Sequence, residues 1–192
     1  PQYEPMMDQH WKPELKYDDP ARYISGNEDI LRMFAAQKPP VRFPPGEQWE
    51  YSNAGYNLLG TIVKRASGMS YADFLKTRVF DPAGMAQSVV YPYVIGNDPL
   101  MPDRVFGYWT EGDGHARLST DGHYLNPAYG EDGVYSTAGD LLKWDRALYT
   151  EKLVKKATLE EAFTPAVLNN GDTTAYGFGW FIGKTPDGKK MA

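Results

Sequence analysis

A tyrosine and an asparagine two positions apart, in the stretch YSNAGYNLLG, are the residues of this sequence whose types and spacing best suit chemistry. Tyr51 carries a phenol, which acts as a general acid or base when a nearby cation lowers its pKa. The amide of Asn53 can donate a hydrogen bond to a carbonyl while it accepts one from an ammonium. Both residues stand before an apolar run, where a helix N-terminus would add N–H groups and partial positive charge. These groups together suit a site that holds an activated serine and an acyl substrate.

The same residues also fit a purely structural interpretation. Ser52 or Asn53 ahead of a helix is an ordinary N-cap, and Tyr51 could be a core aromatic whose hydroxyl is satisfied. Ser52 is interpreted as a cap and not as a nucleophile, because no histidine or lysine within the motif could activate it.

Helices are predicted on both sides of the motif. SGNEDILRMFAAQ predicts a helix that is capped by Ser25 or Asn27 and ended by the prolines at 39–40. The motif opens the next helix, expected over about 54–66, and Gly68 is its C-terminal stop.

Three more helices follow from capping residues. Capping-box spacing places one start at Ser70 and another at Thr137, and a short helix is expected from Thr158. The predicted core of the helical part is apolar and comprises Ile30, Phe34, Leu58, Leu59, Ile62, Val63, Phe74, Leu141, Trp144 and Leu148.

Strands are predicted only in the second half of the chain. Residues 88–135 indicate a loop layer with one hairpin, RVFGYWT and HARLS, joined by residues 111–114. A strand is expected over Phe178 to Gly183, with a turn at Pro186 to Gly188 after it. A lone strand needs partners, so we expect the rest of its sheet to lie outside this sequence.

Three separated blocks of the sequence resemble the serine β-lactamase and penicillin-binding-protein superfamily. They are FPPGEQWEYSNAGYNLLGTIV with the following SGMSYADF and VFDPAGM, then GEDGVYSTAGDLLKW, then AYGFGWFIG. They are most similar to the branch that holds class C β-lactamases, D-alanyl-D-alanine carboxypeptidases and related esterases. The resemblance covers about Phe43 to Gly183. It implies an α+β fold, mainly the helical region of a β-lactamase/transpeptidase-like fold, whose C-terminal strand belongs to a larger antiparallel sheet.

The resemblance also implies roles for the two motif residues. Tyr51 corresponds to the phenol of a proton relay, and Asn53 to the amide that binds the substrate carbonyl and steadies the catalytic lysine. The family's Ser-x-x-Lys motif is absent, because no serine here has a lysine three residues later. The family's Lys/His-x-Gly motif is absent as well, since KTPDGKK does not match it. We therefore expect residues 1–192 to be a single incomplete domain, the central part of a longer enzyme, and to be inactive alone.

Composition excludes several other classes of protein. Acidic residues outnumber basic ones 25 to 20, giving a net charge of −5, which disfavours nucleic-acid binding. The sequence contains no run of 18 apolar residues, so no membrane span is predicted. The chain has no cysteine, and His10, His115 and His123 lack metal-ligand spacing, so no metal or other cofactor is predicted.

Three aromatic residues of the loop layer are candidates for substrate contact. Tyr108, Trp109 and Tyr129 could line a cleft, or they could simply pack the loops against one another.

The expected function is that of a serine hydrolase which forms an acyl-enzyme on a β-lactam, a D-alanyl peptide or an ester. The alternative is a catalytically inactive relative that serves as a binding or regulatory module. The expected partners are a small-molecule or peptide substrate and the remaining segments of the same protein. A periplasmic or secreted location is implied by the resemblance alone.

Overall fold

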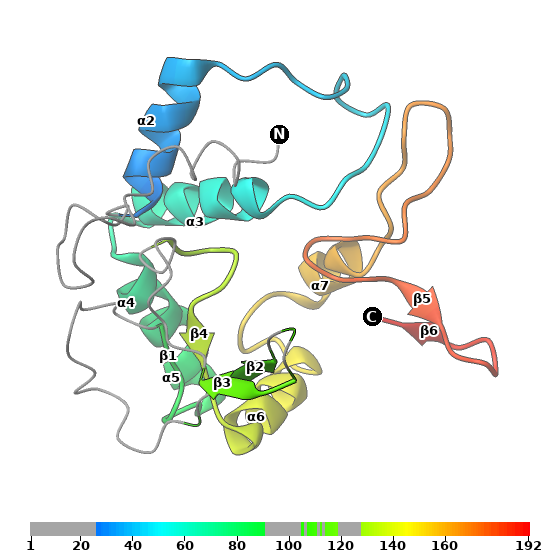
Figure 1. Ribbon diagram of the computed structural model, residues 1–192. Helices are drawn as coiled ribbons and strands as arrows, with labels where there is room; N and C mark the ends of the chain where they lie inside the picture. The colour runs from blue at the N-terminus through cyan, green and yellow to red at the C-terminus, as the bar shows by residue number, and fades with distance from the viewer. Residues whose placement is uncertain (1–25, 91–104, 106, 111, 113, 119–127) are drawn as a thin grey trace, which may run out of the picture.

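The computed structural model describes residues 26–90, 105, 107–110, 112, 114–118 and 128–192 (Figure 1). The predicted cap Ser25 lies outside the described residues. The fold combines helices with short antiparallel strand pairs, so the α+β class is confirmed.

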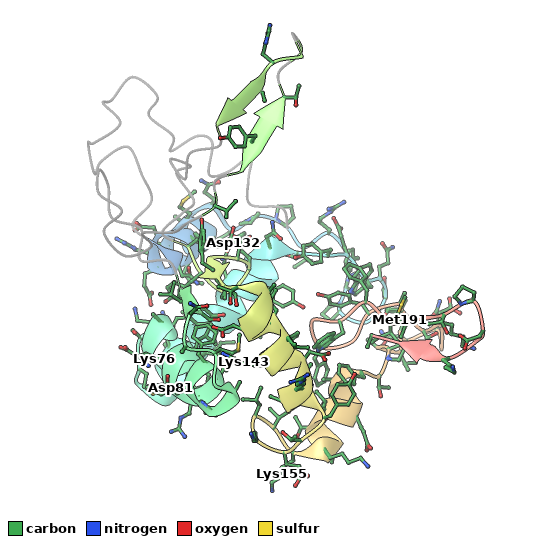
Figure 2. All side chains as sticks on the ribbon, turned by 90° about the horizontal axis from the view of Figure 1, so that it is seen from below. Lys76, Asp81, Asp132, Lys143, Lys155 and Met191 are labelled. Carbon is green, nitrogen blue, oxygen red and sulfur yellow. The ribbon has the colours of Figure 1, made fainter. Side chains whose placement is uncertain are left out.

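The helices lie in two groups along the described chain. Their bounds are α2 Asn27–Gln37, α3 Asn53–Ser67, α4 Tyr71–Leu75, the π-helical segment η2 Lys76–Phe80, α5 Asp81–Ala83, α6 Ala138–Leu148 and α7 Lys156–Ala162. The strands form three antiparallel pairs, namely β1 Val89–Val90 with β4 Val134–Tyr135, β2 Tyr108–Thr110 with β3 Ala116–Leu118, and β5 Gly183–Lys184 with β6 Lys190–Met191. The β2–β3 pair is the predicted hairpin, and it projects clear of the helices in Figure 2.

Three helices begin at the predicted caps. The hydroxyls of Ser52, Ser70 and Thr137 each accept a hydrogen bond from the backbone N–H three residues later. Each bond satisfies one of the N–H groups that a helix start leaves without an intrahelical partner. Gly68 ends α3 in the left-handed conformation, with φ of 70°, as predicted.

Asn27 was predicted as a cap, and this prediction is wrong. Gly26 is the N-cap residue of α2, and Asn27 is buried at the junction of three segments. Its Nδ2 donates to the carbonyl oxygens of Asn57 (2.8 Å) and Tyr129 (2.9 Å) and to Oγ1 of Thr61 (3.2 Å). Its Oδ1 accepts from the backbone N–H of Tyr129 at 2.8 Å. One amide thus joins α2, α3 and the 128–130 segment.

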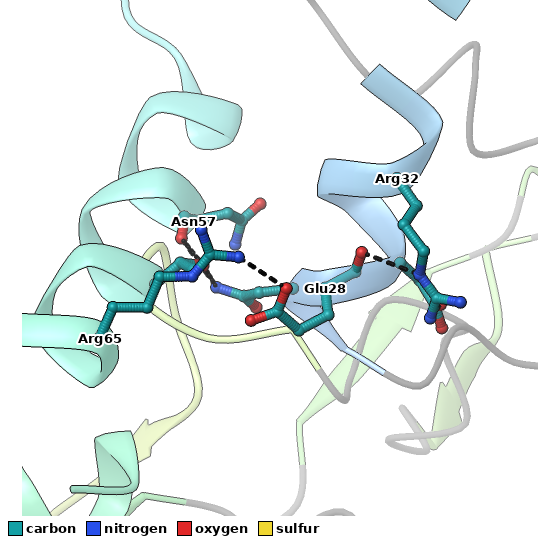
Figure 3. Close-up of polar contacts among 7 residues, drawn as sticks. Glu28, Arg32, Asn57 and Arg65 are labelled. Atoms are coloured by element: carbon teal, nitrogen blue, oxygen red, sulfur yellow. Dashed lines mark hydrogen bonds and ion pairs between the residues drawn. The ribbon is translucent and has the colours of Figure 1, made fainter. Parts of the chain in front are cut away.

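The outer side of the α2–α3 junction carries charged side chains. Figure 3 shows Arg65 of α3 reaching Glu28 of α2, with Nη2 and Oε2 2.9 Å apart. Arg32 lies one turn further along α2 and donates from Nε to the Glu28 carbonyl oxygen at 3.3 Å. Both arginines are exposed, so these contacts are expected to add little stability beside the buried amide network.

The predicted core is only partly correct. Ile30 is buried, but Leu58 and Leu141 are exposed, and Leu59 and Ile62 of α3 are 52% and 59% exposed. The buried residues of α3 are small or polar: Ala54, Asn57, Gly60 and Thr61. A Cβ at Gly60 would lie 3.0 Å from the carbonyl oxygen of Tyr129, so this face fits closely against the 128–130 backbone. The exposed side chains Leu58, Leu59 and Ile62 of α3 therefore do not belong to the face that packs against the 128–130 backbone.

The predicted strand Phe178 to Gly183 is only partly correct: its first residues lie in a tight turn, whereas Phe181 forms an antiparallel bridge with Tyr176 and Gly183 begins β5. The Gly177 N–H donates to the Trp180 carbonyl at 2.9 Å, and Gly179 has φ of 83°, which favours glycine. A Cβ at Gly177 would lie 2.1 Å from the carbonyl oxygen of Ala162, so a larger residue cannot sit there. After the turn, the Ile182 N–H donates to the Ala175 carbonyl at 2.8 Å, and the turn predicted at 186–188 joins β5 to β6.

Asp140 connects the start of α6 to the turn that precedes β1 by hydrogen bonds. Its side chain is fully buried, and its Oδ2 accepts from the backbone N–H of Gln87 (2.7 Å) and from the Ser88 hydroxyl (2.9 Å). Lys143, labelled in Figure 2, completes the contact by donating to Oδ1 of Asp140 at 2.8 Å and to the Gly84 carbonyl at 2.9 Å. The carboxylate is therefore satisfied on both oxygens.

Candidate functional site

Tyr51 and Asn53 lie at the N-terminus of α3, as predicted. Tyr51 precedes the helix in extended chain, Ser52 is the cap with φ of −144°, and Asn53 is the first helical residue. The Ser52 hydroxyl accepts from the N–H of Gly55 at 3.2 Å, which confirms its interpretation as a cap. The Tyr51 side chain is 47% exposed, so it is accessible.

Two further tyrosines surround the ring of Tyr51. Tyr56, one turn into α3, stacks against it with ring centroids 6.1 Å apart and planes 27° apart. Tyr176, from the segment before the 177–180 turn, meets it edge-on at 6.3 Å and 90°. The hydroxyls of Tyr56 and Tyr176 are hydrogen bonded to each other at 2.6 Å. Tyr56 and Tyr176, 120 positions apart in the sequence, therefore flank the Tyr51 ring on two sides, and we call these two rings the walls.

The walls belong to an apolar pocket of about 550 Å³. Such a volume suits a small-molecule site. Its lining residues come from the approach to α3, from α3 itself and from the C-terminal turn: Trp49, Glu50, Tyr51, Ser52, Gly55, Tyr56, Leu59, Tyr176, Gly177, Phe178 and Gly179. Glu50 is the charged residue of this lining, and it is already paired with Arg42.

The approach to α3 is held in place by Asn169. The Asn169 N–H donates to the Gly46 carbonyl at 2.8 Å, and its Nδ2 donates to the Pro45 carbonyl at 3.2 Å. Gly46 has φ of 82°, and a Cβ there would lie 2.5 Å from Oδ1 of Asn169. Glycine is required at this position on both counts. The loop that leads to Tyr51 is thus fixed against the same C-terminal region that supplies Tyr176.

The three tyrosines differ in their hydrogen bonding. Burial, and then the hydrogen bond with Tyr176, raise the pKa of Tyr56 well above its ordinary value. Tyr56 therefore stays neutral at physiological pH. In the part of the chain that the structure describes, no hydrogen bond engages the Tyr51 hydroxyl, which leaves it available to a group that enters the pocket.

Tyr108 and Tyr129 of the loop layer are not among the residues that line this pocket. Tyr108 is 69% exposed on β2, and Trp109 is the next residue of the same strand, opposite Arg117. Tyr129 stacks on Tyr71 at 4.9 Å, beside the buried face of α3. The substrate-binding role of Tyr108, Trp109 and Tyr129 stays a prediction.

Sequence reasoning missed Trp49, Tyr56, Tyr176 and Phe178 as residues of the site. The stretch WEYSNAGY places three aromatics within eight residues around the motif, and this density is a signal that could have found Trp49 and Tyr56. Trp49 packs on Tyr176 with centroids 5.2 Å apart. Tyr176 and Phe178 carry no local signal, because only the fold brings them to residue 51.

A second pocket, of about 500 Å³, lies at the other end of α3. It is formed by the end of α3, by α4, η2 and α5, and by residues 152–153, and it includes the cations Arg78 and Lys152. It contains no residue of the Tyr-x-Asn motif. Since the two volumes are similar, the motif and not the pocket size marks the candidate site.

Two searches of the described residues bear on other functions. Within these residues, no group of three or more His, Cys, Asp or Glu side chains could hold a metal ion. Over the same ranges, no helix is both long and apolar enough to cross a membrane.

Comparison with known proteins gives a consistent set of relatives. The family model described as beta-lactamase matches residues 6–191. Penicillin-binding protein 4* of Bacillus subtilis (strain 168) is 41% identical in an alignment 175 residues long, which covers 85% of this chain and 38% of that protein. The chain therefore spans well under half the length of this curated relative.

Solved structures show the same likeness. The penicillin binding protein from Bacillus halodurans matches with a TM-score of 0.72 at 28% identity, over 98% of this chain and 54% of that one. The D-amino acid amidase from Ochrobactrum anthropi SV3, complexed with L-phenylalanine amide, matches with a TM-score of 0.67 at 25% identity, over 95% of this chain and 50% of that one. These matches confirm the resemblance that the three sequence blocks indicated.

Proposed function

This chain belongs to the beta-lactamase family, and from that premise we propose that the whole protein is a serine hydrolase that works through an acyl-enzyme. Residues 1–192 supply the Tyr-x-Asn part of its site. The serine and lysine of Ser-x-x-Lys and the Lys/His-x-Gly motif are supplied by segments outside this sequence. The supporting observation is the Tyr51 phenol, which lies at an apolar pocket with its hydroxyl unengaged by the described residues.

In this proposal the two motif residues have separate tasks. Tyr51 accepts the proton of the serine hydroxyl as the serine attacks the acyl carbon, and it returns that proton to the leaving group. In this proposal the lysine of Ser-x-x-Lys is the cation that lowers the pKa of the phenol. Asn53 donates to the substrate carbonyl and accepts from the same lysine.

The substrate is an acyl compound whose exact class stays open among β-lactams, D-alanyl peptides and simple esters. The names of the relatives favour amide bonds over esters, since they include penicillin-binding proteins and a D-amino acid amidase. Pocket residues and not the fold decide the substrate. The apolar lining around Tyr51 suits an acyl group without charge near the reacting carbon.

The alternative is a catalytically inactive relative that binds a peptide or cell-wall ligand. It is motivated by the lack of Ser-x-x-Lys in these residues. Covalent labelling of the full-length protein by a fluorescent penicillin or a fluorophosphonate would support the hydrolase and oppose this alternative. A complete reading frame without an upstream Ser-x-x-Lys would end the hydrolase proposal.

The Tyr51→Phe change in the full-length protein is the direct test of the mechanism. It removes only the hydroxyl, so we expect turnover to fall by about 10² to 10⁴, the usual contribution of general acid–base catalysis. The thermal midpoint should hardly change, because the ring remains.

Tyr149→Phe is the matched control, since Tyr149 is exposed at the end of α6 and lies outside the pocket lining. We expect its turnover to equal that of the wild type. Unchanged turnover in Tyr51→Phe would mean that the residue is only a structural aromatic.

A further inference from the structure

We infer that Tyr56 and Tyr176 are positioning residues, whose mutual hydrogen bond holds the two walls that orient the Tyr51 phenol. This inference rests on the proposed function, because it assigns the pair a task in that reaction. Neither residue belongs to the Tyr-x-Asn motif.

Neither a helix nor burial fixes the Tyr51 side chain. Tyr51 stands before the first turn of α3, outside any regular element, and nearly half of the residue is exposed. Two rings at 90° and 27° to it restrict the phenol in two directions. Stacked and edge-to-face aromatic pairs are favourable beyond the area that they bury, so they favour one rotamer of Tyr51 over the others.

Tyr56 and Tyr176 are themselves held in place. Tyr56 is fixed by α3, and Tyr176 is packed between Trp49 at 5.2 Å and Phe181 at 5.0 Å. The carbonyl of Tyr176 accepts from the Ala166 N–H at 3.0 Å and from the Thr174 hydroxyl at 2.8 Å. The 2.6 Å bond between the two hydroxyls then sets the distance between α3 and the C-terminal turn.

The hydrogen bonding of the three phenols distinguishes Tyr51 from the other two. The Tyr56–Tyr176 bond commits one hydroxyl proton and one lone pair to the pair itself. Burial and this bond raise the pKa of Tyr56, and the nearby Tyr51 raises it further. The two hydroxyls of the pair are thus engaged with each other, while the Tyr51 hydroxyl, which is not committed in the described chain, takes part in the proposed proton transfer. Two groups of the same type are in this way given different roles by their surroundings.

A positioning role makes a specific prediction about kinetics. Displacing a reacting group by about 1 Å can cost 10²-fold in rate, whereas substrate affinity depends on other contacts. Loss of one neutral hydrogen bond is worth about 0.5–1.5 kcal/mol, or roughly 2- to 13-fold. We therefore expect Tyr56→Phe and Tyr176→Phe each to lower kcat by roughly 2- to 13-fold and to leave KM unchanged.

The experiment measures kcat and KM for Tyr56→Phe, Tyr176→Phe and the double variant in the full-length protein. Because both changes remove the same bond, the double variant should be no slower than the slower single variant. Tyr71→Phe is the matched control: Tyr71 is also a partly buried tyrosine in an aromatic pair, with Tyr129, and it lies outside the pocket lining. Its kcat should match the wild type.

The outcomes separate this inference from the proposed function. If Tyr51→Phe abolishes turnover while both wall variants keep wild-type kcat, the positioning role is refuted and the proposed function stands. Multiplying effects in the double variant, or a rise in KM at constant kcat, also refute it. If Tyr51→Phe itself keeps full turnover, the proposed function fails first.

Discussion

A buried amide at residue 27 illustrates how single residues organise this chain. Asn27 bonds to Asn57, Thr61 and Tyr129, which belong to segments between 30 and 102 positions away. In Asn27→Ala the backbone groups of Tyr129 and Asn57 would lose their partner inside the protein. We expect a loss of about 1–3 kcal/mol in the free energy of unfolding, measured by urea denaturation of the full-length protein.

The control for this prediction is Asn170→Ala. Asn170 is exposed and bonds only locally, to Asp172, in the described chain. Its substitution should change stability by less than about 0.5 kcal/mol. Equal effects of the two variants would show that the Asn27 network contributes nothing beyond local structure.

The predictability of a residue's role depends on the range of its contacts. Ser52 was identified correctly because its partner is three positions away. Asn27 also stands at a helix start, where asparagine is a common cap, but its hydrogen bond to the distant carbonyl of Tyr129 makes it a buried link between segments. The Tyr51 and Asn53 positions followed from the motif, whereas Tyr176 reaches the site from 125 positions along the sequence by tertiary contacts alone.

At the scale of elements, capped helices were predicted well and the last strand only in part. The helix starts at Ser70 and Thr137 depend on hydrogen bonds to the backbone N–H three residues later, so the local sequence predicts them. The Phe178 to Gly183 segment has the apolar composition of a strand, but Gly177 and Gly179 allow a turn that fits against the end of α7. The close approach to Ala162, which decides between the two structures, is a tertiary contact.

The contact between α6 and the turn before β1 is predicted to be sensitive to acid. The hydrogen bond from Lys143, followed by those from Gln87 and Ser88, lowers the pKa of Asp140 below its usual value. A carboxyl with a depressed folded pKa stabilises the fold above its unfolded pKa of about 3.9, and this stabilisation is lost as pH falls through the folded pKa. Asp140→Asn should therefore lower the thermal midpoint at pH 7.

The measurement is a series of thermal melts of the full-length protein and this variant from pH 7 to pH 3. The difference in midpoint should be constant down to about pH 5 and should shrink below about pH 4. Asp145→Asn, on an exposed part of the same helix, is the control, and its midpoint should follow the wild type throughout. A difference that persists unchanged at pH 3 would contradict the role of the Asp140 charge.

At the scale of the whole molecule, the described chain exposes much apolar surface. Leu58, Leu59 and Ile62 of α3 and Phe178 and Phe181 of the C-terminal segment are all exposed. Soluble monomers rarely leave so many large apolar side chains in one region. We expect the apolar side of α3 to pack against segments of the whole protein that lie outside this sequence.

It follows that residues 1–192 produced alone should associate and bind a hydrophobic dye such as ANS. Replacing Leu58 and Ile62 by glutamine should reduce dye binding and association, while Lys64→Gln on the same helix should not. Size-exclusion chromatography with dye fluorescence makes this comparison. A sharp, cooperative melt of a monomeric 192-residue chain would show that the exposed side chains need no partner.

The hydroxyl bond between Tyr56 and Tyr176 also has a consequence for synthesis on the ribosome. The two residues are 120 positions apart, so at about 5–20 residues per second roughly 6 to 24 s pass between their appearance. During that interval the nascent chain already contains Tyr51, Asn53 and the helix behind them, but neither Tyr176 nor Asn169 exists to enclose them. The order of translation thus delays completion of the site until the segment with Asn169 and Tyr176 has been made.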